Sequence, residues 1–167
     1  MQVISVIGYS GSGKTHLIEF LIKKFKTELD LEVSVVKYIH EHRIDEEGKD
    51  SFKFSDAGAV FSVIKNKFNQ NAIYLNKKIS LDALINWLNK SPYKVDLIII
   101  EGFRNVSYPT ILCVKEIKDI DVQLNKNVKL ISGLITLNRF SEERELQIPI
   151  FSIEQNFERF TKIFNIP

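Results

Sequence analysis

A glycine-rich octapeptide near the start of the chain restricts the possible folds more than any other feature. Residues 8–15 read Gly-Tyr-Ser-Gly-Ser-Gly-Lys-Thr and directly follow an apolar run at residues 3–7. The next segment has an apolar side chain at every fourth position, as on one face of a helix: Leu17, Leu21, Phe25 and Leu29. A strand, a glycine-rich turn and a helix, in this order, are the context in which the Walker A pattern Gly-x-x-x-x-Gly-Lys-Thr forms a phosphate-binding loop.

The residue types of this loop suit a chain of phosphates. Glycines let successive backbone N–H groups point inward at phosphate oxygens, and the helix N-terminus adds further donors. Lys14 is expected to reach the β- and γ-phosphates, and the Thr15 hydroxyl to bind Mg²⁺. The alternative is a turn that only joins a strand to a helix. The residues predicted to bind the nucleotide are Ser10, Gly11, Ser12, Gly13, Lys14, Thr15 and His16.

A nucleoside triphosphate site also needs a carboxylate near Mg²⁺, and two residues compete for that role. Asp96 begins the most hydrophobic run of the chain, and Glu101 follows its end. Ligands of parallel sheets bind at the carboxyl ends of the strands, and Asp96 lies about 16 Å from that end. We therefore favour Glu101 as the Mg²⁺ residue, directly or through water, and predict Lys14 and Glu101 as catalytic residues. In the alternative, Glu101 only holds a neighbouring loop.

Alternating strand and helix patterns predict an α/β fold, a P-loop NTPase three-layer sandwich with a mostly parallel sheet. Strands are expected at residues 2–7, 32–38, 59–65, 71–76, 96–100, 110–115, 129–137 and 148–153. Helices are expected at residues 14–28, 51–57, 81–89 and 154–164. Asp50 or Ser51 is expected to cap the second helix, and Ser80 the third. The two strands between residues 59 and 76 suggest a β-hairpin extension. The 167 residues fit one nucleotide-binding domain.

Composition argues against several other classes of protein. The net charge is +2 and the basic residues are scattered, so we expect no nucleic-acid partner. Cys113 is the only cysteine, which excludes an intrachain disulfide and suits a core position. No apolar run approaches the roughly 20 residues that span a bilayer. Without a recognisable signal peptide, we expect a cytoplasmic protein and no membrane contact.

Two polar stretches leave their roles open. Residues 39–51 include His40 and His42, whose spacing lacks a closed zinc pattern. Within this stretch, Gly48-Lys49-Asp50-Ser51 could offer a cation and backbone N–H groups to an anion, or it could be a solvated loop. Guanine-specific P-loop proteins often carry Asn-Lys-x-Asp after a late strand. This chain has Asn138 and a basic residue there, but Ser141 replaces the aspartate, so the base is undecided.

The order and spacing of several blocks resemble the MobB family, the molybdopterin-guanine dinucleotide biosynthesis adaptor proteins. The resemblance runs from Met1 to about residue 115. The blocks are residues 8–15, 36–40, Asp45 with 48–51, 56–59, 101–104 and 108–109. The family usually has a histidine or basic residue in the helix after Ser51, where Lys53 is only a loose match.

The resemblance implies a GTP-binding protein with weak intrinsic GTPase activity and Mg²⁺ as its metal. It also implies a homodimer that assists the MobA-type guanylyltransferase, which attaches GMP to molybdopterin in the molybdenum (or tungsten) cofactor pathway. Residues 48–51 would then belong to a functional surface. A P-loop small-molecule or nucleotide kinase is the alternative, but it would need an arginine-rich lid, and the five arginines are not clustered.

Overall fold

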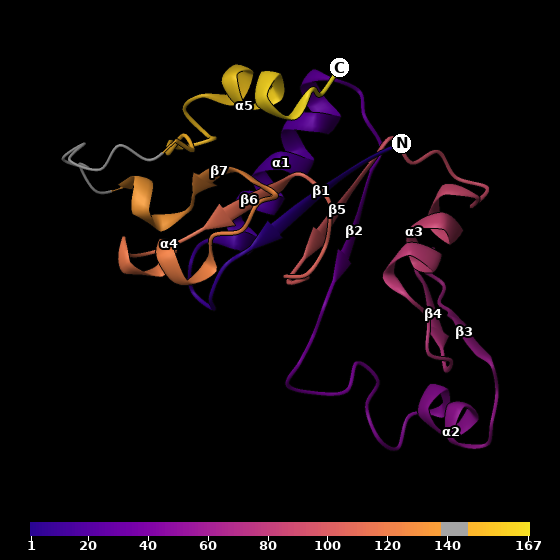
Figure 1. Cartoon of the computed structure of the whole chain (residues 1–167). Coiled ribbons are helices and arrows are strands. Elements are labelled where there is room, and N and C mark those ends of the chain that lie inside the picture. The colour runs from indigo at the N-terminus through magenta and orange to yellow at the C-terminus, as the bar shows by residue number, and fades with distance from the viewer. Residues whose placement is uncertain (138–146) are drawn as a thin grey trace. The chain divides into compact units, whose positions relative to one another are not determined.

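A five-stranded parallel sheet dominates the first of two compact units in the computed structural model (Figure 1). The structure describes residues 1–137 and 147–167. Unit 1 comprises Met1–Tyr38 and Asn89–Pro167, and unit 2 comprises Ile39–Leu88. The strands of the sheet are β1 (Gln2–Ile7), β2 (Val33–Lys37), β5 (Leu97–Glu101), β6 (Thr110–Cys113) and β7 (Val128–Ser132). Their order is β2-β5-β1-β6-β7, so the predicted α/β class with a mostly parallel, P-loop NTPase-like sheet is confirmed.

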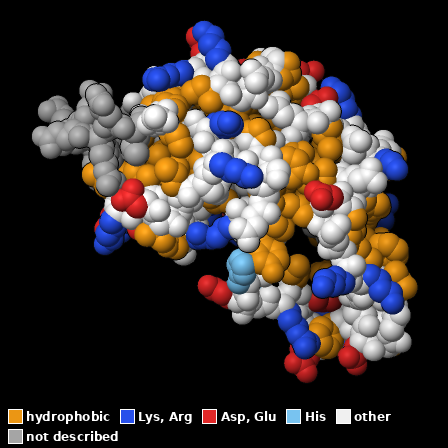
Figure 2. All heavy atoms as spheres, viewed as in Figure 1, with side chains coloured by type: hydrophobic (Ala, Val, Ile, Leu, Met, Phe, Trp, Pro, Cys, Tyr) orange, Lys and Arg blue, Asp and Glu red, His pale blue; other side chains and the backbone are white. Residues whose placement is uncertain are grey.

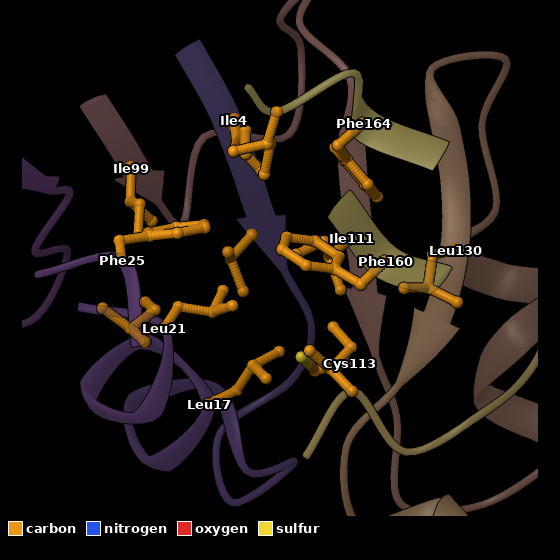
Figure 3. Close-up of a cluster of buried hydrophobic side chains, with 14 of the residues drawn as sticks. Ile4, Leu17, Leu21, Phe25, Ile99, Ile111, Cys113, Leu130, Phe160 and Phe164 are labelled. Carbon is orange, nitrogen blue, oxygen red and sulfur yellow. The ribbon is translucent and has the colours of Figure 1, made fainter. Parts of the chain in front are cut away.

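Helices of unit 1 cover both faces of this sheet. They are α1 (Lys14–Glu28), α4 (Lys118–Gln123), α5 (Phe157–Phe164) and the 3-10 helix η1 (Leu134–Leu137). On one face, Phe25 of α1 and Phe160 of α5 are fully buried against strand residues such as Ile4, as Figure 3 shows. On the other face, Ile120 of α4 packs in a second buried cluster with Ile7. Strand residues therefore alternate between two apolar layers, as in a sheet buried on both faces.

Unit 2 contains α2 (Asp50–Asp56), β3 (Phe61–Lys65), β4 (Asn71–Leu75) and all but the last residue of α3 (Leu81–Asn89). β3 and β4 pair antiparallel, which confirms the predicted hairpin. Asn66 shapes the turn, because its side-chain oxygen accepts hydrogen bonds from the N–H groups of Phe68 (2.9 Å) and Gln70 (3.1 Å). The Ser80 hydroxyl accepts from the Ala83 N–H at 3.1 Å and so confirms the predicted cap of α3.

Four sequence-based predictions of local structure are wrong. The strand expected at 129–137 ends at Ser132, because Gly133 turns the backbone (φ +91°) into η1. The strand expected at 148–153 is reduced to a single bridge between Ile131 and Ile150. Helix α5 begins at Phe157 rather than 154, and α4 was not predicted. Helix α2 has Lys49 as its N-cap residue, without a side-chain cap, instead of Asp50 or Ser51.

On the face shown in Figure 2, basic and acidic side chains lie interspersed among apolar and neutral ones. In the part of the chain that the structure describes, none of the helices combines the length and the apolar character needed to cross a membrane.

Candidate functional site

The glycine-rich loop follows β1 and is pressed against the neighbouring backbone. A Cβ atom at Gly8 would lie only 2.1 Å from the carbonyl oxygen of Cys113, in β6. A Cβ atom at Gly133 would lie 2.5 Å from the carbonyl oxygen of Ser12. That carbonyl also accepts a hydrogen bond from the Leu134 N–H (3.2 Å). The loop after β1 and the turn after β7 thus touch through backbone atoms, which is possible only where glycine stands.

Helix α1 begins in a way that suits an anion. Its N-cap residue is Gly13, with left-handed backbone angles (φ 94°, ψ 8°) and no side-chain cap hydrogen bond. The first turn also contains no acidic residue. The first N–H groups of a helix lack partners within the helix and carry a partial positive charge. The start of α1 therefore offers donors that no side chain of the helix satisfies, as at phosphate-binding helix termini.

A pocket of about 360 Å³ lies at this helix start and collects most of the predicted residues. Six of the seven predicted nucleotide-binding residues line it: Ser10, Gly11, Gly13, Lys14, Thr15 and His16. The seventh, Ser12, is buried, and its hydroxyl has no hydrogen-bond partner among the described residues. Lys37, Glu101 and Leu134 complete the lining.

The Lys14 ammonium is held at the loop itself. Its Nζ donates to the carbonyl oxygens of Gly8 (3.0 Å) and Tyr9 (2.8 Å). These contacts place the cation across the loop whose N–H groups would cradle phosphates. A cation in this position is suited to anionic oxygens, because charge-assisted hydrogen bonds are the strong ones.

Glu101 brings a carboxylate to the same pocket. It is the last residue of β5, pairs in register with Val6 and Lys37 on the flanking strands, and is only 7% exposed. Its Oε1 lies 3.5 Å from the Lys37 ammonium. A carboxylate this buried needs a partner, and Lys37 supplies the positive charge. Both side chains line the pocket, so this ion pair lies within the candidate site.

The competing carboxylate, Asp96, has a structural role at the opposite end of β5. Its Oδ2 accepts from the Glu32 N–H at 2.9 Å and lies 3.0 Å from the Lys94 ammonium. The backbone hydrogen bond from Glu32, together with Lys94, holds the pKa of Asp96 below its usual value. Asp96 joins the starts of β2 and β5. Of the two carboxylates, only Glu101 lines the pocket at the start of α1, called the phosphate-loop pocket below.

Aromatic side chains flank the loop. The Arg104 guanidinium lies 5.2 Å from the centroid of the Tyr9 ring, within the range of a cation–π contact. The rings of Tyr38 and Phe103 lie 5.2 Å apart. These contacts link the residues after β2 and β5 to each other and to the second position of the glycine-rich loop. Arg104 does not line the pocket in this arrangement.

The polar segment at residues 39–51 lies in unit 2 and contacts its own helix. One oxygen of Asp45 accepts from the Ser51 hydroxyl and the Glu46 N–H, both at 3.0 Å. Lys49 pairs with Glu46 at 2.7 Å, and this contact raises the pKa of Lys49. Within residues 1–137 and 147–167, no three His, Cys, Asp or Glu side chains are grouped to hold a metal. Asn138, Arg139 and Ser141 lie outside the described residues.

Sequence reasoning missed two contributors to the pocket. Lys37 could have been found from its position at the end of a strand beside the strand of Glu101, because parallel strand ends share one edge. Leu134 gives no such signal, because the apolar pattern of residues 129–137 fits a continuous strand. Gly133, just before it, was the available hint of a break.

Comparisons with known proteins show which family and fold this chain shares. A family model described as "MobB: Molybdopterin guanine dinucleotide synthesis protein B" matches residues 3–136. The molybdopterin-guanine dinucleotide biosynthesis adapter protein of Haemophilus influenzae is 32% identical over 155 residues, covering 85% of this chain and 85% of that protein. A putative adapter protein of the same description from Methanocaldococcus jannaschii is 33% identical over 121 residues, or 70% of this chain. The chain spans about half of that relative, since the match covers 48% of its length.

Solved structures support the fold. The crystal structure of Bacillus subtilis MobB matches 100% of both chains with a TM-score of 0.77 and 22% identity. The MobB homolog from Bacillus stearothermophilus matches 99% of this chain and 97% of its own, with a TM-score of 0.69 and 22% identity. The resemblance predicted from the sequence is therefore confirmed, and the chain belongs to the MobB family.

Proposed function

We propose that this chain binds GTP with Mg²⁺, hydrolyses it slowly, and serves as an adapter in molybdopterin-guanine dinucleotide biosynthesis. One observation carries the nucleotide part of the proposal. Lys14, Thr15 and Glu101 line a single pocket at the carboxyl ends of β1 and β5, where α1 begins without a side-chain cap. Membership of the MobB family supports the pathway.

The side chains present fit a magnesium ion. Mg²⁺ prefers oxygen ligands and is usually held by one or two protein groups together with phosphates and water. The Thr15 hydroxyl and the Glu101 carboxylate are such groups, and both line the pocket. Mg²⁺ supplies neutralisation of charge on the phosphates, and Thr15 and Glu101 would hold it. The Lys37 ammonium offsets the negative charge of the buried Glu101 carboxylate.

Slow hydrolysis follows from the groups that surround the pocket. Fast GTPases add a residue that orients water and an arginine that stabilises charge in the transition state. Among the described residues, the charged side chains that line the pocket are those of Lys14, Lys37 and Glu101, with His16 beside them. Glu101 is already paired, and Arg104 contacts the Tyr9 ring. A cis arginine would therefore require Arg104 to leave that ring, and a partner could supply one in trans.

The proposed partners are a second copy of the chain and a MobA-type guanylyltransferase of the molybdenum cofactor pathway. Support comes from the hairpin of unit 2, which exposes large apolar side chains. Val63 is 62% exposed, Ile73 52% and Phe68 71%. Val63 and Ile73 are direct neighbours across the hairpin, and adjacent exposed apolar side chains are typical of protein–protein contacts. Sedimentation of the chain alone and with the guanylyltransferase measures both associations.

Replacing Lys14 with alanine tests the nucleotide site. Loss of a charge-assisted contact is expected to weaken Mg·GTP binding by about tenfold or more, measured by titration calorimetry. Lys118→Ala is the matched control, because Lys118 lies in α4 and pairs on the surface with Glu116. Equal GTP affinity of the Lys14→Ala variant and the wild type, with both folded by circular dichroism, would contradict the proposal.

A further inference from the structure

A second cavity of about 220 Å³ adjoins the phosphate-loop pocket. Gly13, His16 and Leu134 line both cavities, so the two meet at the start of α1. The backbone bond from the Leu134 N–H to the Ser12 carbonyl fixes the second cavity against the loop. The base of a nucleotide is joined through ribose to its phosphates. A base must therefore lie beside the phosphate pocket, as this cavity does.

The walls of this cavity suit a flat heterocycle. Leu17, Leu134 and Leu137 provide apolar surface from α1 and η1. Such pockets bind by apolar contact and use a few placed polar groups to select the ligand. The charged side chains that line the cavity, among residues 1–137 and 147–167, are Glu154 and, when protonated, His16.

Glu154 is held in a defined orientation. Its Oε2 accepts a hydrogen bond of 2.8 Å from the hydroxyl of Ser152, which is buried. The Ser152 carbonyl in turn accepts from the Asn156 side-chain amide at 3.1 Å. The other oxygen, Oε1, lies 3.9 Å from the Nε2 of His16, and the Glu154 side chain is 35% exposed. The carboxylate thus retains acceptor capacity on both oxygens at the cavity wall.

Two adjacent acceptors distinguish guanine from adenine. The Watson–Crick edge of guanine presents N1–H and the 2-amino group side by side, and both are donors. The same edge of adenine presents an acceptor at N1, which a carboxylate would repel. We infer that the second cavity is the base subsite of this protein and that Glu154 reads guanine, although the chain lacks the usual aspartate after Asn138. This inference rests on the proposed binding of a nucleoside triphosphate.

The Glu154→Gln variant tests this inference, because it should change the preferred nucleotide from GTP to XTP. An amide offers one acceptor and one donor, which matches the N1–H and the 2-oxo group of xanthine. The matched control is Glu158→Gln, which removes the same charge from the first turn of α5, outside the cavity lining. Mg²⁺ complexes of GTP, ATP and XTP are titrated into each protein by calorimetry.

The wild type and the Glu158→Gln control are expected to bind GTP at least about tenfold more tightly than ATP. Glu154→Gln is expected to lose about tenfold or more in GTP affinity, to gain in XTP affinity, and to keep its ATP affinity. Unchanged ATP affinity shows that the phosphate site and the fold are intact.

Four results overturn the inference. If the wild type binds GTP and ATP equally, or if Glu154→Gln keeps the preference for GTP, Glu154 does not read the base and the proposed phosphate site stands. If Glu154→Gln loses all three nucleotides equally, its role is structural. If the wild type binds none of them, the proposed function fails together with the base subsite.

Discussion

Replacing Gly133 with alanine is expected to disturb the phosphate loop without touching any of its residues. Gly133 follows β7, where its backbone has a φ of +91°. A Cβ atom there would lie 2.5 Å from the Ser12 carbonyl oxygen, 3.1 Å from the Cys113 Cβ and 3.2 Å from the Val114 nitrogen. Two of these neighbours are backbone atoms. The clash is therefore relieved only if the loop or β6 moves.

The magnitude follows from two separable contributions. A positive φ at a residue other than glycine costs about 1–3 kcal/mol. Overpacking in a tight site adds about 1–3 kcal/mol. We expect Gly133→Ala to lower the free energy of unfolding by about 2–6 kcal/mol, a large part of the roughly 5–15 kcal/mol that folds a domain. Gly58→Ala isolates the backbone contribution, because Gly58 has a φ of +100° and no atom within 4 Å of its Cβ position.

Urea unfolding of the two variants, followed by circular dichroism, measures the difference. GTP titrations then show whether the phosphate loop has shifted, and we expect weaker binding for Gly133→Ala alone. Equal losses of stability in the two variants, together with wild-type GTP binding, would refute a role for Gly133 in positioning the loop. In that case the contact between the turn and the Ser12 carbonyl would adjust freely and could not position the loop.

Two further predictions concern the core of unit 1. Phe160→Ala is expected to cost about 3–5 kcal/mol in urea unfolding, because this fully buried ring packs against Phe25 and Phe164. The control is Tyr93→Ala, because the Tyr93 side chain is 79% exposed, and it should change stability by less than about 0.5 kcal/mol; equal losses would contradict the packing. Burial raises the pKa of the Cys113 thiol from 9.0 to about 12. The native thiol then stays protonated while the unfolded one ionises, so stability should fall as the pH rises from about 9 to about 12, by roughly 1 kcal/mol per pH unit. Subtracting the pH profile of Cys113→Ala isolates this slope, and identical alkaline slopes would exclude it.

Local patterns predicted the parts of the fold that local forces determine. The bounds of β1 and α1 agree with the expected residues 2–7 and 14–28, because a buried run and a helical repeat flank a glycine-rich turn. The hairpin and the Ser80 cap were equally accessible, since each depends on residues close in sequence. The sequence also predicted that Lys14 and Glu101 would lie in one pocket, because the carboxyl ends of parallel strands lie at one edge of the sheet.

The errors have two causes, a distant backbone contact after β7 and local side-chain hydrogen bonds before α5. The apolar residues after Gly133 fit a strand as well as a helix, and an apolar pattern alone cannot separate short cases. The bond between the Leu134 N–H and the Ser12 carbonyl joins positions more than 100 residues apart, so no local pattern signals it. Glu154 was expected inside a helix, whereas the Ser152 side chain and carbonyl organise a turn before Phe157. Because the helix was predicted to begin at residue 154, the sequence did not indicate that Glu154 lies in a turn at the cavity.

The absence of a side-chain cap at the start of α1 affects how stable this helix is without a ligand. A serine or aspartate in place of Gly13 would stabilise many helices by a few tenths of a kcal/mol or more, and an acidic first turn would add to this. The chain has neither feature at the start of its longest helix. A bound anion would accept hydrogen bonds from the first N–H groups of α1, which a capping side chain satisfies in many helices. Part of the stability of this helix would then come from the bound ligand. Backbone amide exchange at residues 13–16 should accordingly slow when the site is filled, and would report occupancy from within the helix itself.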